Sequence, residues 1–155
     1  MDDTRTMSID DVTARLDAIA AASDKALRET AVAHADELLA LGETILERWA
    51  LAHDKTPTSD TVEGFRILAL HRQGARGEPS FNACRETCRE LVYHHNLVRL
   101  EPADPDTARR LRLGGMVARH LALFVGGKLE VAGLGDFCCS SRPLRQDEAI
   151  SDRTV

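Results

Sequence analysis

The segment from Pro79 to Glu101 places apolar side chains at steps of three and four residues, the spacing of one face of an α-helix. At about 100° per residue, this face collects Phe81, Cys84, Cys88, Leu91, Val92, His95 and Val98. The opposite face carries Arg85, Glu86, Arg89, Glu90 and Tyr93. Ser80 is a suitable N-cap, and Pro79 stops any earlier helix from continuing. We therefore expect a helix with one face in a core and the other in water.

Three other segments repeat this spacing. They are the run from Ser8 to Ala52, in which Ser8 and Asp11 form a capping pattern, the segment Thr61–Gln73, and the segment Asp106–Val125. Together they predict an all-α fold, an antiparallel four- to five-helix bundle with a long N-terminal helix and an irregular C-terminal tail. Short loops favour antiparallel neighbours in such a bundle.

The last helix is expected to end at Gly126-Gly127, with a short extended piece at Lys128–Val131. A β-hairpin around the Gly-Gly pair is the alternative. The predicted organisation is a disordered N-terminus at 1–7, a single helical-bundle domain at 8–134 and an irregular tail at 135–155.

The N-terminal apolar stripe is longer than one compact domain can cover. A continuous helix from Ser8 to Ala52 would be about 67 Å long, whereas a domain of this size has a radius of gyration of about 15 Å. Either the helix breaks near Ser23-Asp24, or part of it reaches beyond its own subunit. The second alternative predicts a homodimer, built mainly through this helix.

Composition excludes several classes of protein. No run approaches the roughly 20 apolar residues that span a bilayer, so we expect no membrane insertion. The acidic, polar N-terminus is not a secretory signal, which favours a cytoplasmic location with reduced thiols. Duplex nucleic acid is a poor candidate partner, because the net charge is −5 and no reading motif is present.

Charge is divided unevenly along the chain. Residues 1–60 carry 6 Lys or Arg against 13 Asp or Glu, whereas residues 105–128 carry 5 against 1. This pattern predicts attraction between an acidic first half and a basic second half, within one chain or between subunits. The alternative is an anion site on the basic half.

The cysteines offer a second possible site. A metal would have to use Cys84, Cys88, Cys138 and Cys139 together, because the chain has 4 cysteines. His95 is too far along the helix from Cys88 to share one zinc ion with it. The alternative is that Cys84 and Cys88 are small buried apolar residues and that His95 is a hydrogen-bonded core histidine.

Arginine, histidine and glycine gather around the segment 71–77. An anion is expected near His71, Arg72 and Arg76, with Arg99 as a further candidate, because guanidinium groups favour oxyanions. The glycines can expose backbone amides, but their spacing matches no phosphate-binding loop. A plain helix-ending turn is the alternative.

Two classes of function follow. The first is a self-associating helical accessory or regulatory protein that acts by binding a protein partner or a second copy. The second is a metal- or anionic-ligand-binding helical protein, with or without catalysis, that uses the Cys84/Cys88 face or the Arg/His-rich faces. No motif identifies catalytic residues or a cofactor.

Overall fold

The computed structural model describes residues 7–134, and within them the chain forms an all-α bundle, as the sequence predicts. Six α-helices and one 3₁₀ helix occur in this part of the chain. They are α1 (Ile9–Ala21), α2 (Asp24–Glu29), α3 (Ala31–Ala52), α4 (Arg66–Ala75), the 3₁₀ helix η2 (Pro79–Cys84), α5 (Arg85–Leu100) and α6 (Thr107–Ala132). No helix among these residues is long and apolar enough to cross a membrane.

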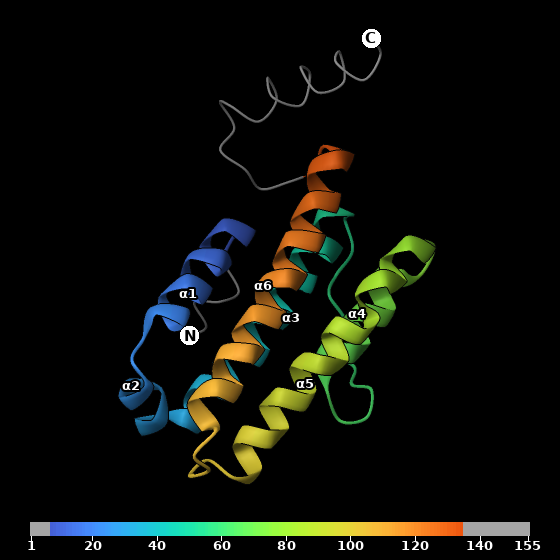
Figure 1. Ribbon diagram of the computed structural model, residues 1–155. Helices are drawn as coiled ribbons and strands as arrows, with labels where there is room; N and C mark the ends of the chain where they lie inside the picture. Colours follow the sequence, from blue (N-terminus) through green and yellow to red (C-terminus); the bar gives the residue numbers. More distant parts are fainter. Residues whose placement is uncertain (1–6, 135–155) are drawn as a thin grey trace.

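α6 occupies the centre of the bundle and contacts α1, α2, α3 and α5 (Figure 1). α3 lies beside it and also contacts α4 and α5. The consecutive pairs α4–α5 and α5–α6 run antiparallel, as does α1 against both α3 and α6 (Figure 1). α3 runs in the same direction as α4 and α6 (Figure 1). The long loop 53–65 carries the chain back to the middle of α3, where Arg66 at the start of α4 meets Glu43.

The N-terminal stretch is broken, which is one of the two alternatives that the sequence leaves open. Ser8 caps α1 in a capping box with Asp11, as expected. α1 ends at Ala21, and the Ser23 hydroxyl accepts from the Ala26 amide to start α2. A continuous helix over 8–52 is therefore wrong, and the apolar stripe is buried within one chain instead of overhanging it.

α4 begins later than predicted. Val62 and Phe65 exchange two backbone hydrogen bonds across Glu63 and Gly64, which both have positive φ, 54° and 85°. This is the backbone of a tight hairpin turn, so a helix cannot start at Thr61. The turn holds Glu63 on the same side of the molecule as α5, where it meets an arginine side chain described below.

The entry to α5 also differs from the prediction. Ser80 is not an N-cap; it lies inside η2, and its hydroxyl donates to Glu78 Oε2 at 2.6 Å. α5 itself starts at Arg85, with Cys84 in the cap position. The predicted apolar face is nevertheless the buried one, because η2 and α5 follow each other with little change of direction. His95 is hydrogen-bonded at both ring nitrogens, to Asn96 and to Asp36.

α6 continues through Gly126-Gly127 to Ala132, so the predicted stop, the extended piece Lys128–Val131 and the hairpin alternative are wrong. Val125 and Leu129 are buried on either side of the glycines, and this packing outweighs the low helix propensity of glycine. The helix ends at Gly133, whose φ of 74° is left-handed, the usual conformation after a helix C-terminus.

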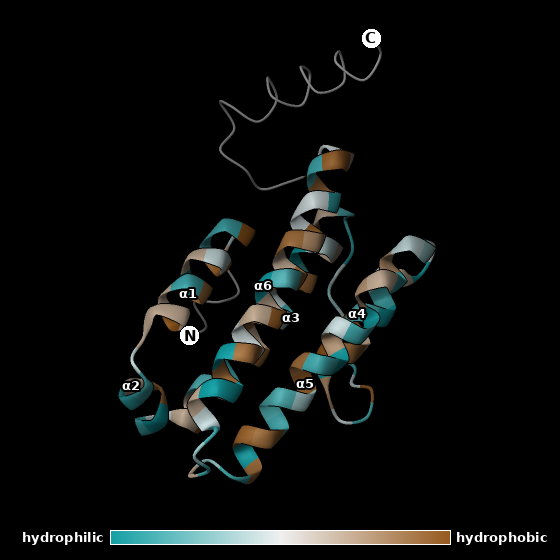
Figure 2. Ribbon diagram, viewed as in Figure 1, coloured by the Kyte–Doolittle hydropathy of each residue, from teal (hydrophilic) through white to brown (hydrophobic). Residues whose placement is uncertain are grey.

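The core is one cluster of mainly aliphatic side chains shared by all the helices. Polar and apolar residues alternate along each ribbon with helical spacing (Figure 2). Met7, the first described residue, packs against this cluster. Residues 1–6 and the predicted irregular tail at 135–155 lie outside the described residues.

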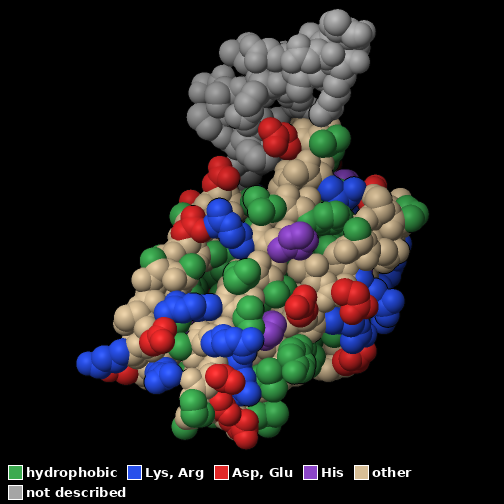
Figure 3. All heavy atoms as spheres, in the orientation of Figure 1, with side chains coloured by type: hydrophobic (Ala, Val, Ile, Leu, Met, Phe, Trp, Pro, Cys, Tyr) green, Lys and Arg blue, Asp and Glu red, His purple; other side chains and the backbone are tan. Residues whose placement is uncertain are grey.

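The acidic and basic halves of the chain meet within one molecule, as one of the sequence alternatives predicts. Arg112 pairs with Asp24 at 2.5 Å, and Arg119 pairs with Asp17. Arg99 pairs with Asp36 at 3.0 Å. Charged side chains of both signs are accordingly interspersed on the face that Figure 3 shows.

Two helical glycines, Gly74 on α4 and Gly127 on α6, should respond in opposite ways to substitution by alanine. A Cβ on Gly74 would lie 2.6 Å from Cε2 of Phe81 and 3.0 Å from Cδ1 of Trp49, and these rings have little room to move. We expect Gly74→Ala to lower the free energy of unfolding by about 1–2 kcal/mol, because overpacking outweighs the gain in helix propensity. Gly127→Ala, on an open helix surface, should raise it by about 0.5–1 kcal/mol. Urea unfolding measures both; a stabilising Gly74→Ala would contradict the packing argument.

Candidate arginine pocket and buried thiols

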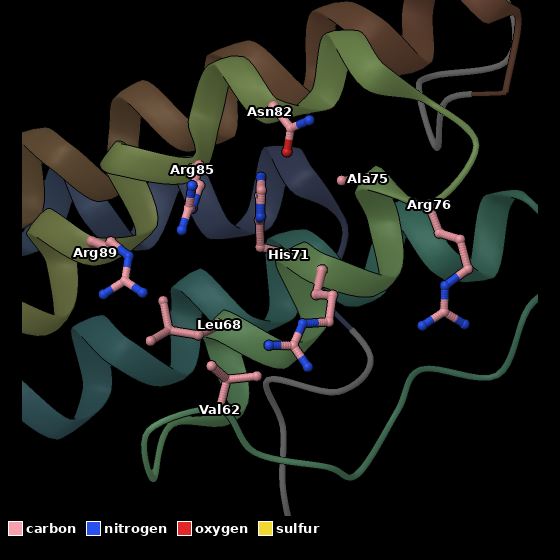
Figure 4. Close-up of a pocket in the computed structure, with 9 residues that line it drawn as sticks. Val62, Leu68, His71, Ala75, Arg76, Asn82, Arg85 and Arg89 are labelled. Atoms are coloured by element: carbon pink, nitrogen blue, oxygen red, sulfur yellow. The ribbon is translucent and has the colours of Figure 1, made fainter.

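A pocket of about 380 Å³ opens between α4 and α5 (Figure 4). We call it the arginine pocket and define it by its five lining side chains of histidine and arginine, which are His71, Arg72, Arg76, Arg85 and Arg89. Asn82 and a few apolar side chains complete the wall. Four guanidinium groups around one hollow make it the strongest candidate for a binding site in the described part of the chain.

Antiparallel packing of α4 against η2 and α5 brings these residues together. Arg72 and Arg76 are four residues apart at the end of α4, and Arg85 and Arg89 are four residues apart at the start of α5. Arg85 and Arg89 therefore lie on one side of α5, whereas Arg76 follows the last residue of α4 with an extended backbone. Like charges four residues apart on a helix are destabilising, so the fold keeps an unfavourable arginine pair on α5 beside the two arginines at the end of α4.

The charge of the pocket is only partly neutralised. Arg89 makes a two-pronged ion pair with Glu63, with distances of 2.7 and 3.2 Å. The hydrogen bond from Arg89 lowers the pKa of the Glu63 carboxyl. Arg72, Arg76 and Arg85 form no ion pair with any carboxylate among residues 7–134. The amino-terminal end of α5 adds the positive end of a helix dipole.

A second, polar hollow of about 870 Å³ adjoins the first and shares Arg72 and Arg76 with it. Its other wall is the hydroxyl-rich loop 56–61. Gln73 fixes this loop to α4, since its side chain donates to the Thr56 carbonyl and accepts from the Thr58 amide, both at 2.9 Å. Arg72 and Arg76 can therefore face a ligand from either hollow.

His71 links the arginine pocket to two buried thiols. Its Nε2 donates to the Phe81 carbonyl at 3.0 Å, and the Cys84 thiol donates to the same oxygen at 3.3 Å. A hydrogen bond from Cys88 lowers the pKa of Cys84 to about 6, and a hydrogen bond from His71 acts in the same direction. The pKa of Cys88 is raised, because its proton is held by the Cys84 sulfur.

The structure brings together some of the site residues predicted from the sequence and separates others. His71, Arg72 and Arg76 share the arginine pocket, but Arg99 is bound to Asp36, about 21 Å along the axis of α5 from Arg85. Cys84 and Cys88 touch each other, whereas Cys138 and Cys139 lie outside the described residues. No group of three or more His, Cys, Asp or Glu side chains in the range 7–134 is arranged to hold a metal ion.

Sequence reasoning missed two arginines and one contact. The like-charge pair of Arg85 and Arg89 was visible in the sequence, and an unfavourable pair of this kind is a signal for a bound anion. The contact between Cys84 and His71 joins two helices, so helical spacing within a single segment could not reveal it.

Comparison with protein-family models, with curated proteins and with solved structures finds no match for this chain.

Proposed function

We propose that the protein binds a small anionic ligand in the arginine pocket. The observation that carries this proposal is the grouping of Arg72, Arg76 and Arg85 around one hollow, where none of the three forms an ion pair with a carboxylate of the described chain. Guanidinium groups bind phosphate, sulfate and carboxylate groups with paired hydrogen bonds. A bound oxyanion would relieve the repulsion among the arginines of the pocket and would compete with Glu63 for Arg89.

The ligand class is a phosphorylated or carboxylated small molecule with further polar groups. The anionic group fits the arginine pocket, and hydroxyl or amide groups of the same ligand suit the adjoining loop 56–61. The pocket supplies charge and hydrogen bonds but few apolar surfaces. We therefore propose a binding role, such as sensing or delivery of the ligand.

Thermal unfolding in the presence of inorganic phosphate, sulfate and organic phosphates tests this proposal. A ligand at 100 times its Kd stabilises the folded state by about 2.7 kcal/mol, which for a chain of this size raises Tm by about 5–10 °C. We expect Arg85→Gln to lose most of this rise. Without anion, Arg85→Gln should leave Tm unchanged or slightly higher, because one repulsive pair is removed.

Arg109→Gln is the matched control, because it removes the same charge from an exposed position on α6 that does not line the pocket. It should keep the full anion-induced rise in Tm. If both variants lost the anion-induced rise in Tm equally, the rise would depend on the net charge of the protein and not on the pocket. No rise with any of these anions in the wild-type protein would contradict anion binding.

A second proposal is self-association, now through α6 instead of the N-terminal helices. Met116, Leu123 and Val131 are 65%, 62% and 72% exposed and follow one another at steps of seven and eight along one side of α6. An exposed stripe of this kind favours contact with another protein surface, and a second copy related by two-fold symmetry is the simplest partner. A homodimeric accessory or regulatory protein in the cytoplasm remains a prediction from the sequence.

Light scattering tests the dimer. We expect a mass near twice 17.0 kDa for the wild-type chain and a shift towards the single-chain mass for Leu123→Glu. Leu51→Glu, at an exposed position near the end of α3, should keep the dimer. A wild-type protein that stays monomeric at micromolar concentration would remove this proposal and leave the anion site unaffected.

A further inference from the structure

The two buried thiols, Cys84 and Cys88, do not line the arginine pocket and have no part in the proposed anion binding. Cys84 and Cys88 are 2% and 0% exposed and lie within hydrogen-bonding contact of each other. Their spacing of four residues on one buried face holds the two sulfurs side by side. We propose that Cys84 and Cys88 form a redox-active dithiol that hydrogen peroxide oxidises to an intramolecular disulfide. This inference goes beyond the proposed function and does not require an anion in the pocket.

Position along the chain permits the disulfide. Residues four apart in a helix have Cα atoms about 6 Å apart, within the 4.4–6.8 Å range of disulfides. Their Cβ atoms must still approach, which a regular helix resists. Cys84 is the last residue of η2 and the cap of α5, with φ −99° and ψ 11°. It can therefore move towards Cys88 while only the first turn of α5 is disturbed.

The surroundings of Cys84 favour the thiolate, which is the reactive form of cysteine. The Cys88 thiol and the His71 ring lie beside its sulfur, and together they keep the pKa of Cys84 below the ordinary value despite burial. The amino-terminal end of α5 and the guanidinium groups of the pocket add positive potential. Cys84 is accordingly the attacking thiol, and Cys88, whose pKa is raised, is the resolving thiol.

The reaction balances with hydrogen peroxide as the oxidant. The Cys84 thiolate attacks one peroxide oxygen, an S–O bond forms, the O–O bond breaks, and the leaving hydroxide takes a proton from solvent to become water. Cys84 is then a sulfenic acid. The Cys88 sulfur attacks the Cys84 sulfur, the S–S bond forms, the S–O bond breaks, and the hydroxide leaves as water with the Cys88 proton. Two thiols and one peroxide give one disulfide and two waters.

Access is through the arginine pocket. His71 lines the pocket and lies beside Cys84, so its side chain stands between the hollow and the sulfur. Hydrogen peroxide is close to water in size, and a small outward movement of His71 admits it. Larger hydroperoxides should react more slowly, because the pocket itself does not contain Cys84.

Peptide mapping of the full chain tests the proposal. Trypsin cuts after Arg76, Arg85 and Arg89, which separates the two cysteines into fragments 77–85 and 86–89. After mild peroxide treatment and blocking of free thiols, we expect most of fragment 77–85 to be recovered joined to fragment 86–89, with the mass of the two fragments less two hydrogens. Cys138 and Cys139 fall in a different fragment and report general oxidation of the chain.

Two variants separate the roles. In Cys88→Ser the sulfenic acid on Cys84 should accumulate and be trapped by dimedone, whereas in Cys84→Ser neither trapping at Cys88 nor a joined fragment should occur. Circular dichroism confirms that each variant is folded. Fragment 77–85 that stays reduced while the fragment with Cys138 and Cys139 is oxidised would overturn the proposal. The outcome is independent of phosphate binding, so either proposal can fail alone.

Discussion

Phe81→Ala is expected to lower the free energy of unfolding by about 3–5 kcal/mol, the usual cost of truncating a buried aromatic side chain. The Phe81 ring is fully buried and stacks on Trp49, with ring centroids 4.7 Å apart. It also stacks on His71 at 5.5 Å and touches Phe124. Since 4% of the residues are aromatic, few other side chains can fill the cavity.

Thermal and urea unfolding measure this loss, and Tm should fall by about 10 °C or more. Tyr93→Ala is the control, because Tyr93 is exposed on α5 and its truncation should cost less than about 0.5 kcal/mol. The variant also bears on the site, because the backbone of residue 81 accepts hydrogen bonds from His71 and Cys84. If Phe81→Ala lowered the free energy of unfolding by less than about 1 kcal/mol, the ring contacts of Phe81 would not be a main source of stability for the bundle.

The second large effect is expected at Arg66. This side chain pairs with Glu43 at 3.4 Å and with Glu47, and it donates to the Thr58 carbonyl at 2.8 Å. It thereby joins α4, α3 and the loop 53–65. Arg66→Gln leaves two carboxylates one turn apart without their cation. Breaking a buried pair costs about 3–5 kcal/mol, and partial exposure of all three groups reduces the expected loss to about 2–3 kcal/mol.

The loss at Arg66 should depend on pH. Burial raises the pKa of Glu43, and Arg66 opposes this rise, so the substitution raises the pKa of Glu43 further. A group whose pKa is higher in the folded state stabilises the fold when protonated, and this contribution disappears as pH rises through the folded pKa. Arg66→Gln should therefore be closer to wild type in urea unfolding at pH 5 than at pH 7.

The double variant Arg66→Gln with Glu43→Gln checks the cause. It removes the unpaired carboxylate and should recover much of the stability lost at pH 7. An equal loss at pH 5 and pH 7 in the single variant would mean that the Thr58 contact, and not charge, is what Arg66 contributes.

Much of the helical content could be predicted because burial repeats with the helical period. Cys84, Cys88 and Leu91 were assigned to the inner face of one helix and are buried there. The break at Ser23 was ambiguous, because serine fits both an N-cap and the polar side of a continuing helix. The parallel pairing of α3 with α4 depends on where a long loop leads, which local spacing does not encode.

Only the part of the arginine pocket that comes from one segment of the sequence could be predicted. His71, Arg72 and Arg76 are neighbours in sequence, so their local density indicated an anion site. Arg85 and Arg89 join them only because two helices pack antiparallel. Arg99 also stands near histidines in the sequence, but it lies nearly three turns beyond Arg89 along α5, and its guanidinium is paired with Asp36.

The central place of α6 has a consequence for biosynthesis. This helix is the last one in the described chain, yet it covers the apolar faces of α1, α2, α3 and α5. While the ribosome is still making α5, the surfaces that α6 will cover have no partner from their own chain, although α1, α2 and α5 can already meet α3. The nascent protein therefore exposes apolar surface until α6 has been synthesised, and chaperones can bind this surface during that time. Truncation within α6 should yield aggregates instead of a smaller folded protein.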